Sequence, residues 1–422
     1  MPDSAGIRNV CSCFDNTETN HQYQQSNLRE NLLLLKKNSN NAILLAGIFA
    51  LIVGVGVARF VFTSLLPPML EDSLSLSFAG ILASINYVGY LSGSIFSIFI
   101  KDIHTKVKYF RIGLLLCVVS SFLLGITENS VVWVISRILA GFGAAMALVV
   151  GSAIVMFKLQ LDNKTKAMGI HFSGLGFSIV VTDLIVRGVF AYGGDWQHAW
   201  LALATAGAFL SCYSAYVLCF DKQPKDEVIK HKFDKSLFSP LMIILTLAYF
   251  TEGVGMVVQA TFLPDIVNSL AGLSGYGGYA WLVVGIAGIP SCIIWMRLAH
   301  RFGSINIMIV AMILQIIGIL IPTFSTNIIL NFISGFLYGS TFIGLVALFM
   351  NFAGQLSSKN PVFIMGIITA AYGIGQIVAP LYCVALIKVF NSYNPALYLT
   401  ALIVVSGVLL LGYAKVNFKA VK

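Results

Sequence analysis

Residues 42–66 read AILLAGIFALIVGVGVARFVFTSLL, an apolar run whose length sets the interpretation of the whole chain. An α-helix rises about 1.5 Å per residue, so roughly 20 apolar residues cross the hydrocarbon core of a bilayer, which is about 30 Å thick. Similar runs recur along all 422 residues, of which 58% are hydrophobic and 10% charged. A soluble protein has about a quarter of its residues charged, so this composition indicates an integral membrane protein.

Twelve apolar runs follow one another with polar breaks between them. Lipid offers no partner for backbone hydrogen-bonding groups, so each run is predicted to be a helix rather than an open strand. The fold class is therefore expected to be all-α, with twelve membrane-spanning helices. The predicted spans are residues 42–66, 77–100, 111–127, 131–157, 166–190, 198–219, 239–262, 277–297, 304–322, 327–353, 362–387 and 396–415.

The polar segment 221–235 divides these spans six and six, and short sequences of the first half return in the second at nearly constant separation. Several ordered matches of this kind indicate a duplicated six-helix unit. Because six is even, both halves start on the same side of the membrane and are expected to be parallel repeats. The matches pair 54–56 with 253–255 (GVG in both), 65–67 with 262–264 (LLP and FLP), 137–142 with 331–336 (RILAGF and NFISGF, 194 residues apart) and 168–170 with 365–367 (MGI in both).

This organisation predicts five regions along the chain. The first is polar, rich in Asn and Gln and without the apolar core of a signal peptide, which predicts a disordered cytoplasmic tail. The regions are the tail 1–40, a six-helix bundle at 41–220, a cytoplasmic linker at 221–238, a second six-helix bundle at 239–416 and a short cytoplasmic tail at 417–422.

Positive charge is concentrated on one predicted side of the membrane. Of the 26 Lys and Arg, 22 lie in the two tails or in the breaks after spans 2, 4, 6, 8 and 10. Loops rich in Lys and Arg stay in the cytoplasm, so both termini are predicted to be cytoplasmic. The net charge of +9 then faces anionic membrane lipid, and no motif indicates a nucleic-acid partner. Cys11 and Cys13 lie in the first tail, where two cysteines alone lack the ligands of a zinc site.

Two motifs on the predicted spans resemble those of a transporter family. Residues 137–145 (RILAGFGAA) are similar to the fourth-helix motif of the major facilitator superfamily, with Ala140 where Gln is common. Residues 54–69 (GVGVARFVFTSLLPPM) resemble the first helix of its YbfB/YjiJ-type bacterial branch. The resemblance covers residues 42–415 and implies a secondary transporter in the bacterial cytoplasmic (inner) membrane, with spans 1, 4, 7 and 10 around a central cavity.

Four ionisable residues, Arg59, Arg137, Asp183 and Glu252, lie deep inside predicted spans. A charged side chain near the middle of the bilayer costs about 2.5 to 3.5 kcal/mol on insertion scales. Each of the four is therefore expected to face a partner, a cavity or the interior of the bundle.

A substrate site is predicted from Arg59, Thr63, Tyr249, Asn331 and Gln376. Arg59 and Thr63 share one helical face of the first span, and the resemblance places Asn331 on a span beside the same cavity. The alternatives are that Arg59 extends toward lipid headgroups, and that Asn331 and Gln376 bond neighbouring helices. Two arginines against one central carboxylate favour an anionic solute.

Proton coupling is assigned to Glu252, Arg137, Asp183 and His171. A buried carboxyl can exchange its proton when its surroundings change, which makes Glu252 the central candidate; a fixed salt bridge to an arginine is its alternative. Asp183 precedes Arg187 by four residues, the spacing of a local ion pair. The resemblance implies that Arg137 bonds backbone carbonyls or a carboxylate. The imidazole of His171 titrates near neutrality, and a hydrogen-bonded structural role is its alternative.

The predicted function is secondary active transport of a small solute by alternating access, coupled to protons. Two other classes stay open: a non-transporting receptor or scaffold, which binds without flux, and an intramembrane lipid-modifying enzyme, which needs its reacting groups near one headgroup plane. No Walker A loop, dinucleotide fingerprint or HExxH pattern occurs, so no cofactor and no enzymatic activity are expected. The sequence indicates no obligate protein partner.

Overall fold

The computed structural model describes residues 39–100, 102–161, 164–220, 239–356 and 361–418. Within these ranges the regular structure is helical, and twelve helices are long and apolar enough to cross a membrane. The predicted all-α fold with twelve spans is therefore confirmed. The linker 221–238, most of the two tails, Cys11 and Cys13 lie outside the described residues.

The N-terminal half contributes six spans, two of which consist of consecutive helical segments. The first span is α2 (Asn40–Leu51), η1 (Ile52–Phe60) and α3 (Val61–Asp72); the fourth is α6 (Ser130–Ala145), η2 (Met146–Val150) and α7 (Gly151–Lys158). The other four are α4 (Leu76–Phe99), α5 (Ile103–Ile126), α8 (Lys164–Ala191) and α9 (Trp196–Val217).

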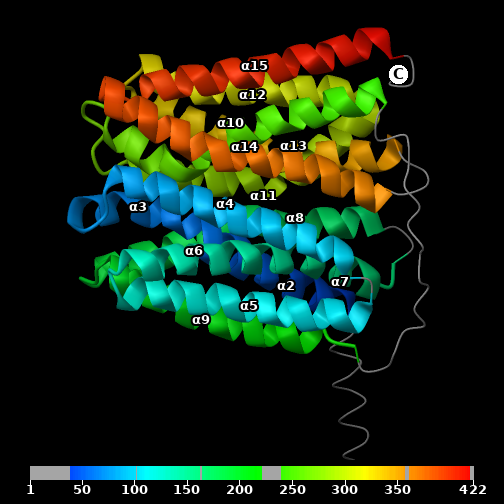
Figure 1. Cartoon of the computed structure of the whole chain (residues 1–422), viewed down its shortest axis with the longest axis horizontal. Coiled ribbons are helices and arrows are strands. Elements are labelled where there is room, and N and C mark those ends of the chain that lie inside the picture. Colours follow the sequence, from blue (N-terminus) through cyan, green and yellow to red (C-terminus); the bar gives the residue numbers. More distant parts are fainter. Residues whose placement is uncertain (1–38, 101, 162–163, 221–238, 357–360, 419–422) are drawn as a thin grey trace, which may run out of the picture.

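The C-terminal half contributes the other six spans as single helices. Figure 1 shows all the spans running lengthwise beside one another, the first half in blue to green and the second in lime to red, on opposite sides of the molecule. The helices are α10 (Pro240–Asn268), α11 (Gly277–Phe302), α12 (Ser304–Phe324), α13 (Ile328–Leu356), α14 (Pro361–Phe390) and α15 (Asn394–Asn417).

Polar residues in the breaks fix the two ends of the bundle. At one end the Asn40 side chain bonds the backbone of Gln160, just beyond α7, and we call this the Asn40 end. At the other end the Asp72 carboxylate accepts a 2.8 Å hydrogen bond from Trp196 Nε1 at the start of α9, and we call this the Asp72 end. These bonds satisfy polar groups at helix termini that have no partner within their own helix.

The first and fourth spans each contain a π-helical segment, and the two segments pack against each other. Every residue of η1 is buried, including Arg59. The N–H of Val61 closes this segment by bonding the carbonyl of Gly56, five residues earlier. π-Helical turns are rare and are found mostly at functional sites, so this segment directs attention to Arg59.

Equivalent side chains make equivalent contacts in the two halves, 198 residues apart. Such repeated contacts confirm that the halves are parallel pseudo-repeats. The equivalent pairs are Asn129 and Asn327, which cap α6 and α13; Ser136 and Ser334, which donate to the carbonyls of Ser120 and Gly318; and Gly141 and Gly339, which lie against the backbones of Asn86 and Val284.

This register differs by one helical turn from the sequence match that aligned Arg137 with Asn331. In the structure Arg137 corresponds to Gly335, and Asn331 corresponds to Trp133. Trp133 Nε1 and Asn331 Nδ2 each donate to a carbonyl in the break before their helix, at 2.5 Å and 2.9 Å. The sequence match was wrong by four residues because both segments contain a Gly-Phe pair, and aligning those pairs shifted the register. The packing contacts define the structural equivalence.

The two halves meet along α4 with α14 and along α8 with α11. At the Asp72 end α3 also packs against α10, where the Thr63 hydroxyl donates a hydrogen bond to the Ala260 carbonyl. Among the described residues, α2 and α7 at the Asn40 end make at most marginal contact with the second half. Around the first span, the halves are therefore packed together more closely at the Asp72 end.

Candidate functional site

Arg59 on η1 is buried, with 7% of its surface exposed, between the rings of two tyrosines on α4. Its guanidinium carbon lies 4.4 Å from the ring centre of Tyr90 and 5.0 Å from that of Tyr87. Cation–π contacts of this kind stabilise a desolvated guanidinium by about 2 kcal/mol or more. They hold the charge inside the bundle, so Arg59 does not extend to the headgroups.

The rings do not satisfy the hydrogen-bonding groups of Arg59. Its Nε and Nη2 are buried and have no hydrogen-bond partner among the described residues. These two nitrogens form one edge of the planar guanidinium, and such an edge binds a carboxylate or phosphate through two parallel hydrogen bonds. An unfilled edge of this kind is costly unless a ligand or water occupies it.

Glu252 on α10 is fully buried in the opposite half. Its Oε1 accepts a 3.2 Å hydrogen bond from Gln315 Nε2 on α12, and its Oε2 has no partner among the described residues. The ion pairs found in the described part of the chain do not include it. A buried carboxylate without a cation is strongly disfavoured, so the neutral, protonated acid is the form that suits this position.

An aromatic stack lies beside Glu252. The Tyr249 ring lies between Phe349 and Tyr372, with ring centres 4.7 Å and 4.5 Å away and planes nearly parallel. Tyr372 lies on α14, which packs against α4, the helix that carries Tyr87 and Tyr90. We call the buried side chains on the two sides of this interface the central cluster: Arg59, Tyr87, Tyr90, Tyr249, Glu252, Tyr372 and Gln376.

Gln376 on α14 belongs to this cluster through α10. Its Nε2 donates weakly to Met256 Sδ, at 3.4 Å, and its Oε1 is buried without a partner among the described residues. Met256 lies one helical turn beyond Glu252 on α10. The predicted substrate residue Gln376 is thus placed beside α10, the helix that carries Tyr249.

Arg137 makes a different set of contacts from Arg59. Its guanidinium donates to the backbone carbonyls of Ala58 (3.1 Å) and Leu82 (3.4 Å), and its guanidinium carbon lies 4.6 Å from the centre of the Phe62 ring. The Asn86 amide bonds the Arg137 carbonyl at 3.1 Å. Arg137 therefore ties together α6, α4 and the first span.

Asp183 and Arg187 form an ion pair of 2.6 Å on α8. Ser64 on α3 also donates to the Asp183 carboxylate, at 3.1 Å. The Arg187 guanidinium carbon lies 4.1 Å from the centre of the Tyr279 ring on α11, in the other half. This group of residues connects the two halves near the Asp72 end, away from the central cluster.

The other three predicted residues have local partners. His171 on α8 shares a 2.8 Å hydrogen bond with Ser152 on α7, and its Nδ1 is unpartnered among the described residues. Thr63 bonds Ala260 across the halves. Asn331 donates to the carbonyls of the break before α13. These contacts place His171 beside α7, Thr63 at the Asp72 end, and Asn331 at the start of its helix.

Sequence reasoning missed Tyr87, Tyr90, Tyr372 and Gln315. Gln315 had a detectable signal, because it is the one amide side chain in the apolar run 307–322. Tyr87 and Tyr90 are three residues apart and so share a helical face, but nothing in the sequence says that this face meets Arg59.

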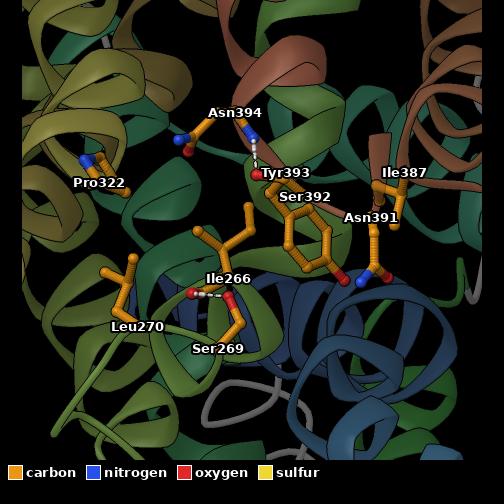
Figure 2. Close-up of a pocket in the computed structure, with 9 residues that line it drawn as sticks. All are labelled: Ile266, Ser269, Leu270, Pro322, Ile387, Asn391, Ser392, Tyr393 and Asn394. Atoms are coloured by element: carbon orange, nitrogen blue, oxygen red, sulfur yellow. Dashed lines mark hydrogen bonds between the residues drawn. The ribbon is translucent and has the colours of Figure 1, made fainter. Parts of the chain in front are cut away.

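A surface pocket of about 330 Å³ lies at the Asp72 end of the second half (Figure 2). The hydrogen bonds drawn there, from Ser269 to the Ile266 carbonyl and from the Asn394 N–H to Ser392, are used within the chain itself. None of the predicted site residues lines this pocket. The central cluster, with its buried and unfilled polar groups, is the better candidate site.

Comparison with known proteins identifies the family. Residues 51–411 match the family described as "Uncharacterised MFS-type transporter YbfB", where MFS stands for major facilitator superfamily. The chain belongs to this family. It is therefore a multi-pass membrane protein of the major facilitator superfamily.

Two curated proteins and one solved structure are similar to this chain. The uncharacterised MFS-type transporter YceJ of Bacillus subtilis is 25% identical over 274 residues, which cover 63% of this chain and 69% of YceJ. The multidrug efflux pump SdrM of Staphylococcus aureus is 25% identical over 146 residues, 34% of this chain and about a third (32%) of the pump's length. The crystal structure of a mutant of the nucleoside transporter NupG superposes with a TM-score of 0.71 at 13% identity, covering 90% of this chain and all of that one, which shows a shared fold.

Proposed function

We propose that this YbfB-type transporter moves a small anionic solute across the bacterial cytoplasmic membrane by alternating access, and that Glu252 carries the coupled proton. The observation that supports this proposal most directly is a pair of unfilled groups on opposite halves. Within the described part of the chain, Arg59 presents Nε and Nη2 without acceptors, and Glu252 presents Oε2 without a donor or a cation. The Arg59 guanidinium suits an anion, and the Glu252 carboxyl suits a proton.

Alternating access is supported by the packing of the two halves. The pseudo-repeats touch closely at the Asp72 end through α3 and α10 and only marginally through α2 and α7 at the Asn40 end. Because Lys and Arg are concentrated at the Asn40 end and in the tails, we assign that end to the cytoplasm. The conformation is then one closed on the outside, and rocking of the halves would expose the central cluster alternately to each side.

Proton coupling follows from the environment of Glu252. The neutral acid suits the buried site, whereas contact with water or with an added cation would favour the carboxylate. Gln315 offers one hydrogen bond but no charge. Arg137 and Asp183 already have partners, so we assign them to positioning the spans and to closing the Asp72 end; His171 remains a secondary candidate for proton transfer.

Transport fits better than the two other classes considered from the sequence. An enzyme acting on lipid would need its reacting groups near a headgroup plane, whereas Arg59 and Glu252 are buried within the two bundles. A receptor would have no need for two pseudo-symmetric halves joined by an interface that is tight at one end. Flux therefore separates transport from simple binding.

The test uses purified protein in proteoliposomes with and without a pH gradient. Glu252→Gln should retain solute exchange between the two sides but lose accumulation against a gradient. Glu128→Gln makes the same chemical change on an exposed acid at the Asp72 end and should behave like the unaltered protein. Unchanged accumulation by Glu252→Gln would remove Glu252 from the coupling mechanism.

The charge preference has a separate test. A panel of labelled anionic, neutral and cationic metabolites should show uptake of anions that Arg59→Ala abolishes. Transport of cations alone, with Arg59→Ala unaffected, would contradict an anionic substrate.

A further inference from the structure

We infer that the solute is a small aromatic monocarboxylate, bound by the free edge of Arg59 with its ring among the central tyrosines. This inference rests on the proposed function for the location of the site. It goes further by specifying the number of charges and the shape of the molecule that the central cluster accepts.

The free edge of Arg59 selects the charged group. Nε and Nη2 lie side by side and in one plane, which matches the two oxygens of a carboxylate. Both are buried, and the described part of the chain supplies no acidic partner for them. A ligand that leaves two such donors unpaired does not compensate the desolvation of the buried guanidinium. A carboxylate is therefore strongly preferred over a neutral analogue.

The second arginine does not add another anion site. The Arg137 guanidinium is already bonded to the carbonyls of Ala58 and Leu82 and covers the Phe62 ring. A second carboxylate on the ligand would therefore be buried without a cation from Arg137. Within the described part of the central cluster, the single arginine with an unfilled edge implies a single carboxylate, so dicarboxylates should bind poorly.

The surroundings of the free edge select the body of the ligand. Tyr87 and Tyr90 contact the guanidinium, and their helix α4 packs against α14 of the other half, which carries Tyr372. One face of the Tyr372 ring is stacked on Tyr249. The other face suits a flat aromatic molecule, which stacks on a ring better than a puckered aliphatic ring does.

Binding to the full-length purified protein in detergent tests the ligand class. Benzoate and cyclohexanecarboxylate carry the same charge on six-membered rings, and only benzoate is flat. Terephthalate adds a second carboxylate, and benzamide removes the charge. By calorimetric titration, benzoate should bind about tenfold more tightly than cyclohexanecarboxylate, with terephthalate and benzamide weaker still.

Two variants connect the binding to the named side chains. Arg59→Lys keeps the charge but loses the two-nitrogen edge, and it should weaken benzoate binding by about tenfold or more. Tyr372→Leu should remove the preference for benzoate over cyclohexanecarboxylate while both still bind. Tyr192→Leu, which alters a tyrosine that is 95% exposed, should change neither affinity. Gel filtration and the unfolding midpoint without ligand show whether each variant is folded.

The outcomes separate this inference from the proposed function. Equal binding of benzoate and cyclohexanecarboxylate, both dependent on Arg59, would overturn the aromatic part and leave anion transport standing. Tight binding of terephthalate would overturn the single-charge argument. Absence of binding by every carboxylate would overturn the inference entirely, and the Glu252→Gln accumulation assay would then decide independently whether proton coupling survives.

Discussion

Gln315 Nε2 on α12 donates a 3.2 Å hydrogen bond to Oε1 of Glu252 on α10. The donor is neutral, so it positions the carboxyl without compensating a negative charge. The bond also joins the seventh and ninth spans within one half, whereas the other carboxyl oxygen has no partner among the described residues. Gln315 thereby holds Glu252 in place through one of its two oxygens.

The first prediction concerns the coupling of these two residues. Gln315→Leu and Glu252→Gln should have non-additive effects on proton-driven accumulation, because Gln315 acts only by positioning the carboxyl that Glu252→Gln removes. The double variant should be no worse than Glu252→Gln alone. Gln259→Leu removes a buried amide on α10 that bonds Gly318 and Ser334 rather than an acid, so its effect should add to that of Glu252→Gln. Additive losses for the first pair would show that Gln315 acts elsewhere.

The second prediction concerns the structural role of Arg137. Arg137→Gln should destabilise the protein by about 1.5 to 3 kcal/mol, because charge-assisted bonds to two buried carbonyls are lost. Arg111→Gln removes a comparable bond to the Ala215 carbonyl, but at an exposed position, so its effect should stay within about 0.5 kcal/mol. Thermal unfolding in detergent measures both. Equal midpoints for the two variants would contradict a structural role for Arg137.

The third prediction tests the register of the repeat. A Cβ at Gly141 would collide with the backbone of Asn86, and a Cβ at Gly339 with that of Val284. Gly141→Ala and Gly339→Ala should each cost about 1 to 3 kcal/mol by overpacking. Gly188→Ala on α8 meets no atom within 4 Å and should be neutral or slightly stabilising. A tolerated alanine at either repeat position would argue against the close helix approach.

The fourth prediction concerns closure at the Asp72 end. Arg187→Gln removes the pair with Asp183 and the contact with Tyr279, and it should favour opening at this end. A cysteine introduced at Ala260, which is 3% exposed, should then react several-fold faster with a membrane-impermeant maleimide. Lys388→Gln alters an exposed cation on α14 near the same end and should leave the rate unchanged. Unaltered labelling with Arg187→Gln would show that the pair does not contribute to closure.

The sequence alone determined the number of the spans. In lipid, the backbone N–H and C=O groups of each segment must form hydrogen bonds within the protein. The length of an apolar run such as 42–66 is therefore nearly sufficient to define a helix. The division at 221–235 and the ordered matches between halves defined the parallel repeat for a similar reason, because duplicated packing requires duplicated small and turn residues. Spans, repeat and family could all be predicted on this basis.

Only the tertiary structure decided which of the buried polar residues are available to a ligand. Arg59 and Arg137 are alike in the sequence, yet the carbonyls of Ala58 and Leu82 happen to surround one guanidinium, while tyrosine rings leave an edge of the other unfilled. Likewise, the sequence alignment paired Asn331 with Arg137. In the structure Asn331 lies one helical turn before the position equivalent to Arg137, and it donates a hydrogen bond to a carbonyl in the break before its helix. Hydropathy and spacing define a helix and its faces, whereas the partner of a side chain depends on distances between helices that no single sequence stretch encodes.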